Sequence, residues 1–188
     1  MENKLLKKTA DLFKEYEVWE SYKELERLIP QIEHSWHSTL ISELKKINKP
    51  KYWTFLPRKN GGVWFLTEEL EGANSLSIWI ENENFSLWAN QNKFNTTDLK
   101  KKICEKEFSV LRDLFPDIEI TEEKDPYIFK ELGNFIYESY NSLSFEQFIW
   151  LAGNKPDVIL SQINERLKQF FTLEVTELFK KLNNATRK

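Results

Sequence analysis

The sequence predicts an α+β protein in which helices from both ends of the chain pack against an antiparallel meander of four to five strands. Three observations carry this prediction. Apolar residues recur at helical spacing over 1–48, alternate with a period of two over 52–90, and return to helical spacing over 97–183. The 188 residues contain no internal repeat, low-complexity tract or linker, so we expect a single domain over 1–188.

The N-terminal helical region shows one signal for an internal break. Ser21 and Glu24 have the spacing of a capping box, which predicts that one helix ends near 18–20 and that another then begins. Pro30 follows inside the apolar pattern, and it either kinks the second helix or opens a separate one. An Asn-Lys-Pro sequence at 48–50 ends the region.

The meander is predicted to consist of two hairpins. Asn60-Gly61 is the strongest turn signal in the chain, and it predicts a two-residue turn between strands at 52–56 and 63–67. In the second hairpin, over 74–90, we expect the turn at Glu83-Asn84 because both flanking segments alternate strictly. The two hairpins together supply four strands.

The second hairpin raises a question about its two tryptophans. If Ile78 and its alternating neighbours face the core, then Trp79 and Trp88 lie on the opposite face, beside Ser77 and Ser86. That face is either the floor of a second core beneath a helix or an exposed pair of anchors for a partner. The chain offers about six amphipathic helices, more than one sheet face accepts, so the buried alternative is favoured.

Helices are predicted to return after the meander. A threonine at 96 or 97 is the expected cap of a helix over about 98–114. A strictly alternating stretch at 118–123 predicts a fifth strand at the edge of the sheet. Asp125-Pro126 predicts the start of the next helix, because proline is favoured in a first helical turn.

The end of the chain carries three further signals. Ser144 and Gln147 have capping-box spacing and predict a helix that stops at Gly153. Pro156 then opens a last long helix, whose apolar stripe continues to Leu182. The polar tail that follows is expected to fray.

The composition limits the possible classes of function. The chain is 40% hydrophobic and 30% charged, with 14 Phe and 7 Trp but only 5 Gly. So few glycines argue against long catalytic loops and glycine-lined phosphate sites. The net charge of −3 argues against a dedicated nucleic-acid binder, because such proteins usually carry a basic excess.

Cysteine content and hydropathy indicate the compartment. Cys104 is the only cysteine, which excludes an internal disulfide and a thiolate metal cage and fits a reducing environment. The N-terminus is charged and amphipathic, unlike a signal peptide, and no apolar run approaches the roughly 20 residues of a membrane span. We therefore expect a cytoplasmic protein without a membrane partner.

Three groups of residues resemble catalytic or metal-binding sets. Asp117 and Glu122, with a following lysine, spell the acidic elements of a metal-dependent nuclease, but about 16 Å of extended chain separates them. His34 and His37 are three residues apart on a helix, and no other histidine exists to complete a metal site. Cys104 has no neighbouring histidine to act as its base. We expect no catalytic residue, no metal and no cofactor.

Basic side chains gather around the first hairpin. With Tyr52 and Trp53 beside them, they could contact a nucleic-acid backbone. Acidic residues elsewhere balance them, so a solvated surface is the favoured interpretation. The basic cluster consists of Lys45, Lys46, Lys49, Lys51, Arg58 and Lys59, and a second basic run covers 100–102.

Three consecutive stretches suggest a family. "ELERLIPQIEHSWHSTLISELKK", "KYWTFLPRKNGGVWF" and "LSIWIENENFSLWA" resemble the C-terminal accessory region of some bacterial and phage PD-(D/E)XK nuclease-superfamily proteins. The resemblance rests on hydrophobic rhythm and tryptophan placement over roughly 20–115. The catalytic strands of that family have no counterpart here, so no active-site residue is carried over. The resemblance implies a non-catalytic module of defence or anti-defence systems.

These observations together predict a non-enzymatic macromolecular-interaction module that binds a protein partner. The prediction follows from large aromatic side chains, few glycines and the lack of a converging catalytic set in the sequence. The alternative is a nucleic-acid-associated protein of nuclease ancestry. The candidate partner-binding residues are Trp79, Trp88, Trp53, Arg58 and Lys59.

Overall fold

A computed structural model describes residues 10–59, 61–81, 84–114, 127–129, 135–138 and 143–188. The strands are β1 (Trp53–Arg58), β2 (Gly61–Leu66), β3 (Ser77–Glu81), β4 (Asn84–Trp88) and β5 (Tyr127–Phe129). The α-helices are α2 (Tyr16–Leu44), α3 (Thr96–Ile103), α4 (Ser109–Asp113), α5 (Phe145–Asn154), α6 (Pro156–Phe170) and α7 (Leu173–Thr186). Two short 3₁₀ helices, η1 (Gly72–Asn74) and η2 (Lys106–Phe108), complete the described elements.

Backbone contacts divide the chain into two compact units, Met1–Ser35 and Trp36–Lys188. In the first unit Phe13 packs back on the beginning of α2, with its ring centroid 5.4 Å from that of Trp19 and 4.9 Å from that of Tyr22. The second unit contains the last part of α2, the sheet and the later helices. The single-domain expectation stays a prediction.

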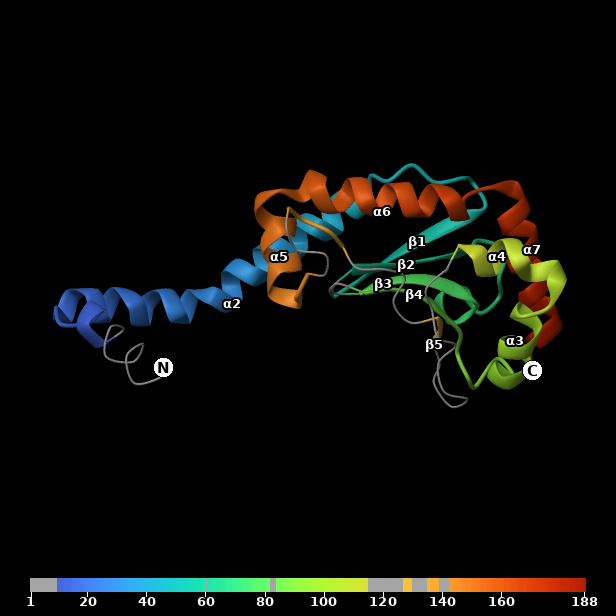
Figure 1. The fold of residues 1–188 in the computed structure, drawn as a ribbon, viewed down its shortest axis with the longest axis horizontal. Coiled ribbons are helices and arrows are strands. Elements are labelled where there is room, and N and C mark those ends of the chain that lie inside the picture. Colours follow the sequence, from blue (N-terminus) through green and yellow to red (C-terminus); the bar gives the residue numbers. More distant parts are fainter. Residues whose placement is uncertain (1–9, 60, 82–83, 115–126, 130–134, 139–142) are drawn as a thin grey trace. The chain divides into compact units, whose positions relative to one another are not determined.

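The five strands form one antiparallel sheet in chain order, β1-β2-β3-β4-β5, with helices flanking the meander (Figure 1). The predicted α+β class is thereby confirmed. The edge strand expected at 118–123 lies outside the described residues. The prediction of a helix that begins at Asp125-Pro126 is wrong. Tyr127–Phe129 form strand β5 instead, which pairs with β4. Pairing with an available strand edge overrides the local helix-start signal there.

One face of the sheet carries the main core of the second unit. Ile78, Ile80 and Phe85 are fully or almost fully buried on this face. Helix α6 runs along it (Figure 1), and the ring centroid of Phe85 lies 5.7 Å from that of Phe170 in α6. Alternation along each strand therefore buries one row of side chains beneath the helices and sends the next row to the opposite face.

The first hairpin turns one residue earlier than predicted. Arg58 pairs with Gly61, so the connecting residues are 59–60 rather than Asn60-Gly61. Gly61 instead belongs to β2, where a Cβ atom would lie 1.9 Å from the carbonyl oxygen of Ile80. The glycine is therefore needed for the close approach of β2 to β3, and its presence in the sequence is not a turn signal.

The second hairpin is displaced in the same way. Glu81 pairs with Asn84, so the connecting residues are 82–83 rather than Glu83-Asn84. The displacement moves the cross-strand pairing by two residues. Because side chains alternate with a period of two, every residue stays on the face that the sequence predicts.

Helix α2 is continuous where the sequence predicts a break. It runs through Pro30, so neither the break at 18–20 nor a separate helix beginning at Pro30 is present. The hydroxyl of Ser21 donates to the carbonyl oxygen of Glu17 one turn earlier, as a serine inside a helix does. The chain leaves helical geometry earlier, at 13–15.

Two helices that were predicted as continuous are divided. The segment 98–114 forms α3, η2 and α4 in succession, and the cap of α3 is Asn95, whose side chain accepts the N–H of Asp98, rather than a threonine. The final helix is α6 followed by α7, because Thr172 caps a new start by accepting the N–H of Val175.

Other helix signals near the C-terminus are confirmed. The side chains of Ser144 and Gln147 form the predicted capping box of α5, and Pro156 occupies the first turn of α6. Helix α5 ends one residue after Gly153. A Cβ atom on Gly153 would lie 1.9 Å from the indole of Trp36, so the glycine makes room for that side chain.

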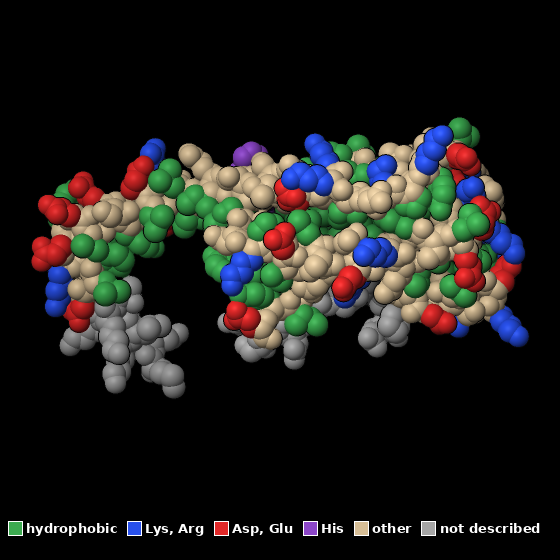
Figure 2. Space-filling model, turned by 90° about the horizontal axis from the view of Figure 1, so that it is seen from above, with side chains coloured by type: hydrophobic (Ala, Val, Ile, Leu, Met, Phe, Trp, Pro, Cys, Tyr) green, Lys and Arg blue, Asp and Glu red, His purple; other side chains and the backbone are tan. Residues whose placement is uncertain are grey.

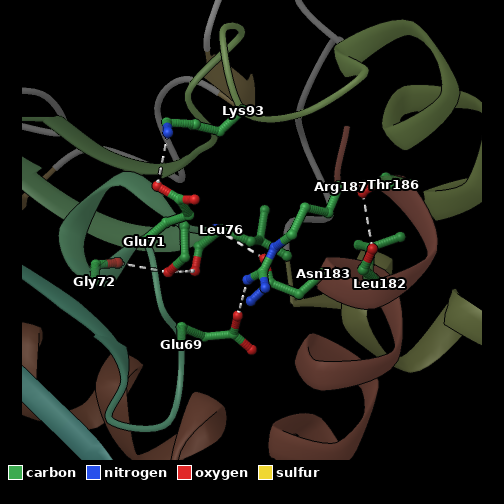
Figure 3. A network of polar contacts seen from close by, with 10 residues as sticks. Glu69, Glu71, Gly72, Leu76, Lys93, Leu182, Asn183, Thr186 and Arg187 are labelled. Atoms are coloured by element: carbon green, nitrogen blue, oxygen red, sulfur yellow. Dashed lines mark hydrogen bonds and ion pairs between the residues drawn. The ribbon is translucent and has the colours of Figure 1, made fainter.

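The last residues of α7 are held by the connection between β2 and β3 (Figure 3). Asn183, which is fully buried, accepts the N–H of Leu76 through its side-chain oxygen at 3.1 Å. Arg187 forms an ion pair with Glu69, whose side chain is 8% exposed. These contacts of Asn183 and Arg187 are called the C-terminal clasp below. The expectation of a frayed tail is wrong because its polar side chains find buried partners.

Candidate functional site

The candidate site lies on the sheet face opposite the one that α6 covers. Strand register places Leu56, Arg58, Trp79 and Trp88 on this second face, because each alternates with a residue of the helix-covered face. These four side chains are called the aromatic face below. Leu56 and Arg58 are exposed, and the two tryptophans are partly buried.

Small residues allow the two indoles to lie against each other. Trp79 pairs with Ser86, and Trp88 pairs with Ser77, so the tryptophans are diagonal neighbours and not directly opposite. Their ring centroids are 5.0 Å apart with a 45° angle between the planes. The Nε1 atom of Trp79 donates to the hydroxyl of Ser77 at 2.9 Å, which fixes the orientation of that ring. Both serines are buried.

Arg58 extends the aromatic face towards the end of β1. Its guanidinium carbon lies 5.2 Å from the centroid of the Trp79 ring, within the range of a cation–π contact. Such a contact contributes about 0.5–1 kcal/mol at an exposed site. Arg58 therefore presents a positive charge whose position is held by a neighbouring indole, while its donor groups remain accessible.

Both tryptophans are mostly buried, as expected. Among the described residues, the contacts shown for their rings come from Arg58, from Ser77 and from the other indole, and the expectation that a helix covers them stays a prediction. Both rings retain some accessible surface. The arrangement combines an apolar platform with the cation of Arg58, and strand register also places the partly buried Glu81 on this face, across Gly61 from Arg58.

The prediction that Trp53 binds a partner is wrong. Its side chain is fully buried, with the ring centroid 5.3 Å from those of Phe171 and Phe179, and its Nε1 atom donates to Thr176 at 3.2 Å. Trp53 lies on the helix-covered face, two residues along the strand from Phe55. Lys59 follows the end of β1 and is exposed.

The residues considered for metal or nucleophilic chemistry do not converge. His34 is exposed, and the ring of His37 packs 5.8 Å from that of Phe145. Cys104 is exposed at the end of α3. In the described ranges, no three His, Cys, Asp or Glu side chains are grouped to hold a metal ion. Asp117 and Glu122 lie outside those ranges.

The basic cluster divides between a groove and the first hairpin. The groove, with a volume of about 800 Å³, lies between the end of α2 and helix α6. Lys46, Lys49 and Lys168 contribute positive charge to it, but Glu43 and Asp157 line it too, and Lys46 forms an ion pair with Glu43. The mixed charge of the groove does not favour a polyanion.

Sequence reasoning missed two features, one on the aromatic face and one beside α6. It did not identify the contact between Arg58 and Trp79, although alternation across two predicted hairpins would place them on one face if the pairing were known. It also missed the groove, because residues 43–50 and α6 are far apart in the chain. No local pattern reports such a contact.

The chain was compared with protein-family models, with curated proteins and with solved structures, and none of the three comparisons finds a match. The resemblance to accessory regions of nuclease-superfamily proteins therefore stays a prediction. In the described part of the chain, no helix combines the length and apolar character that a membrane span requires.

Proposed function

We propose that the chain is a cytoplasmic, non-catalytic module that binds a protein partner through the aromatic face. One observation supports the proposal most directly: two partly exposed indoles lie 5.0 Å apart, and the exposed guanidinium of Arg58 stacks on one of them. Tryptophan and arginine are the residue types that most often dominate the energetics of protein interfaces.

The geometry of the aromatic face indicates the chemistry of the partner. The indoles of Trp79 and Trp88 need little reorganisation on binding, since a hydrogen bond and their mutual contact already restrict Trp79. An apolar side chain of the partner would cover the rings and the neighbouring Leu56. A carboxylate beside it would bind Arg58, preferably through two hydrogen bonds.

Affinity capture from the organism that encodes the chain tests this function. Immobilised parent protein is compared with Arg58→Glu, with Trp88→Ala and with Trp150→Ala, and bound proteins are quantified by mass spectrometry. Trp150 is 43% exposed on α5, so its removal deletes an accessible indole that does not belong to the sheet. We expect one partner to bind the parent and Trp150→Ala, and to bind the first two variants at least tenfold more weakly.

Two results would contradict the proposed function. The first is a partner that binds Arg58→Glu and Trp88→Ala as well as it binds the parent, provided that thermal melting shows all variants to be folded. The second is cleavage of plasmid DNA by the purified protein with Mg²⁺, abolished by Glu122→Ala, which would favour the nuclease alternative.

A further inference from the structure

The part of α2 inside the first unit presents an apolar stripe with regular spacing. Val18, Tyr22, Leu25, Ile29 and Ile32 follow one another at intervals of four, three, four and three residues. At 3.6 residues per turn these five side chains lie within one narrow arc of the helix. They are called the heptad stripe below, because this spacing is that of alternating a and d positions in a coiled coil.

The heptad stripe is largely accessible, although the Phe13 ring packs on Tyr22 at its N-terminal end. Its first four members are between 43% and 54% exposed, which is unusual for large apolar side chains on one face of a helix. In Figure 2 hydrophobic side chains gather along one side of this part of α2, and Asp and Glu side chains lie mainly elsewhere on it. Single exposed apolar residues are common on proteins, but four successive positions of one heptad pattern are not.

Charges on the same helix argue against a membrane surface as the occupant. Residues 16–35 carry five acidic and two basic side chains, whereas helices that bind anionic membranes are rich in lysine and arginine. One of the two basic residues, Arg27, donates to Glu24, and this hydrogen bond lowers the pKa of the Glu24 carboxyl. That cation is therefore already paired with a neighbour on the same helix.

We propose that the heptad stripe pairs with the same stripe of a second copy of the chain, as a parallel two-stranded coiled coil. A 3.5-residue repeat is matched by another helix with the same repeat, and a second copy supplies one. The residues that flank the stripe determine whether the two helices pair parallel or antiparallel. Glu26 and Glu33 border one side of the stripe, and the uncharged Ser21 and Leu28 border the other.

Parallel, in-register pairing places Glu26 beside Ser21 of the second copy and Glu33 beside Leu28 of the second copy. Antiparallel pairing would place the two acidic borders against each other, which is unfavourable. The stripe covers few turns of helix, so the buried interface is small and we expect a weak, reversible dimer whose population depends on protein concentration.

Sedimentation equilibrium of the full chain, at about 1 to 300 µM, tests the pairing. The parent is compared with Leu25→Glu on the stripe and with Gln31→Glu, which adds the same charge to an exposed position on another face of the same helix. We expect Leu25→Glu to raise the dimer dissociation constant at least tenfold and Gln31→Glu to leave it unchanged.

Disulfide formation tests the parallel direction separately. In a Cys104→Ser background, Leu25→Cys should form a disulfide-linked dimer with a mild thiol oxidant, because parallel in-register helices bring the two positions 25 within bonding distance. Gln31→Cys should not. A link between cysteines placed at 22 and 25, but not between two cysteines at 25, would contradict the parallel arrangement.

Three other outcomes would overturn the pairing itself. The first is a parent protein that is monomeric at every concentration. If Leu25→Glu but not Gln31→Glu then lowers the melting temperature, the stripe packs within its own chain. Equal dimerisation of Leu25→Glu and the parent would place the interface elsewhere. Binding of the parent to anionic phospholipid vesicles, lost in Leu25→Glu, would identify a membrane surface as the occupant.

Discussion

The seven tryptophans of this chain serve different purposes, and the burial of those in the second unit separates them. Trp53 is fully buried and donates to Thr176, whereas Trp79 is partly buried and donates to Ser77 within the sheet. Trp150 is exposed on α5. The residue type alone therefore does not reveal whether a tryptophan packs the core or lies on a surface, and the sequence placed Trp53 wrongly for this reason.

Truncation of three tryptophans to alanine should separate these environments. We expect Trp53→Ala to lower the free energy of unfolding by about 3–5 kcal/mol, because it leaves a cavity between β1 and the α6–α7 region. Trp88→Ala should cost about 1–2 kcal/mol and Trp150→Ala less than about 0.5 kcal/mol. Urea unfolding followed by circular dichroism measures all three. A Trp88→Ala cost equal to that of Trp53→Ala would mean that the aromatic face is core.

At the scale of elements, alternation proved a better guide than turn chemistry. The prediction of which strand residues share a face is confirmed although both turns were placed one residue late, since a two-residue shift in pairing preserves the face. The turn prediction failed because Gly61 is required by the neighbouring strand. The break between α6 and α7 was missed because the apolar stripe continues past the cap at Thr172.

Gly153 and Trp36 allow a test of how α2 and α5 fit together within the second unit. Gly153→Ala should lower the free energy of unfolding by about 1–3 kcal/mol, because the new methyl group overlaps the Trp36 indole. In a Trp36→Ala background the same change should raise it by about 0.5–1 kcal/mol, since alanine favours a helix over glycine. Urea unfolding of the parent, the two single variants and the double variant gives the coupling free energy between positions 36 and 153. Equal effects in both backgrounds would exclude this contact.

At the scale of the whole molecule, basic and acidic side chains nearly balance, with 27 Lys and Arg against 30 Asp and Glu. The basic cluster is interrupted by Glu43 and Asp157 at the groove, and the net charge is −3. Binding to a short DNA or RNA duplex near physiological salt should therefore be no tighter than about 10⁻⁴ to 10⁻⁶ M by fluorescence anisotropy. Submicromolar binding with a steep salt dependence, lost when Arg58 and Lys59 become glutamate, would favour the nucleic-acid alternative.

The C-terminal clasp joins the last helix to the middle of the sheet region. Arg187→Ala should lower the free energy of unfolding by about 3 kcal/mol, because it leaves the nearly buried Glu69 carboxylate without its cation. Lys181→Ala, which removes a solvent-exposed ion pair with Glu107, should cost less than about 1 kcal/mol. Thermal melting measures both. Adding Glu69→Gln to Arg187→Ala should recover part of the loss, and a further loss would contradict the explanation.

The clasp also has a consequence for the order in which the molecule is made. A ribosome that adds roughly 5–20 residues per second needs about 5–20 s to proceed from the end of β4 to Lys188. During that interval Ile78 and Ile80 lack the helix that buries them, α6, until it is synthesised. Glu69 likewise lacks its ion-pair partner until Arg187 is synthesised. Native structure in the second unit can therefore close only once Arg187 has been synthesised, and a nascent chain stalled before α6 exposes the apolar row of the sheet.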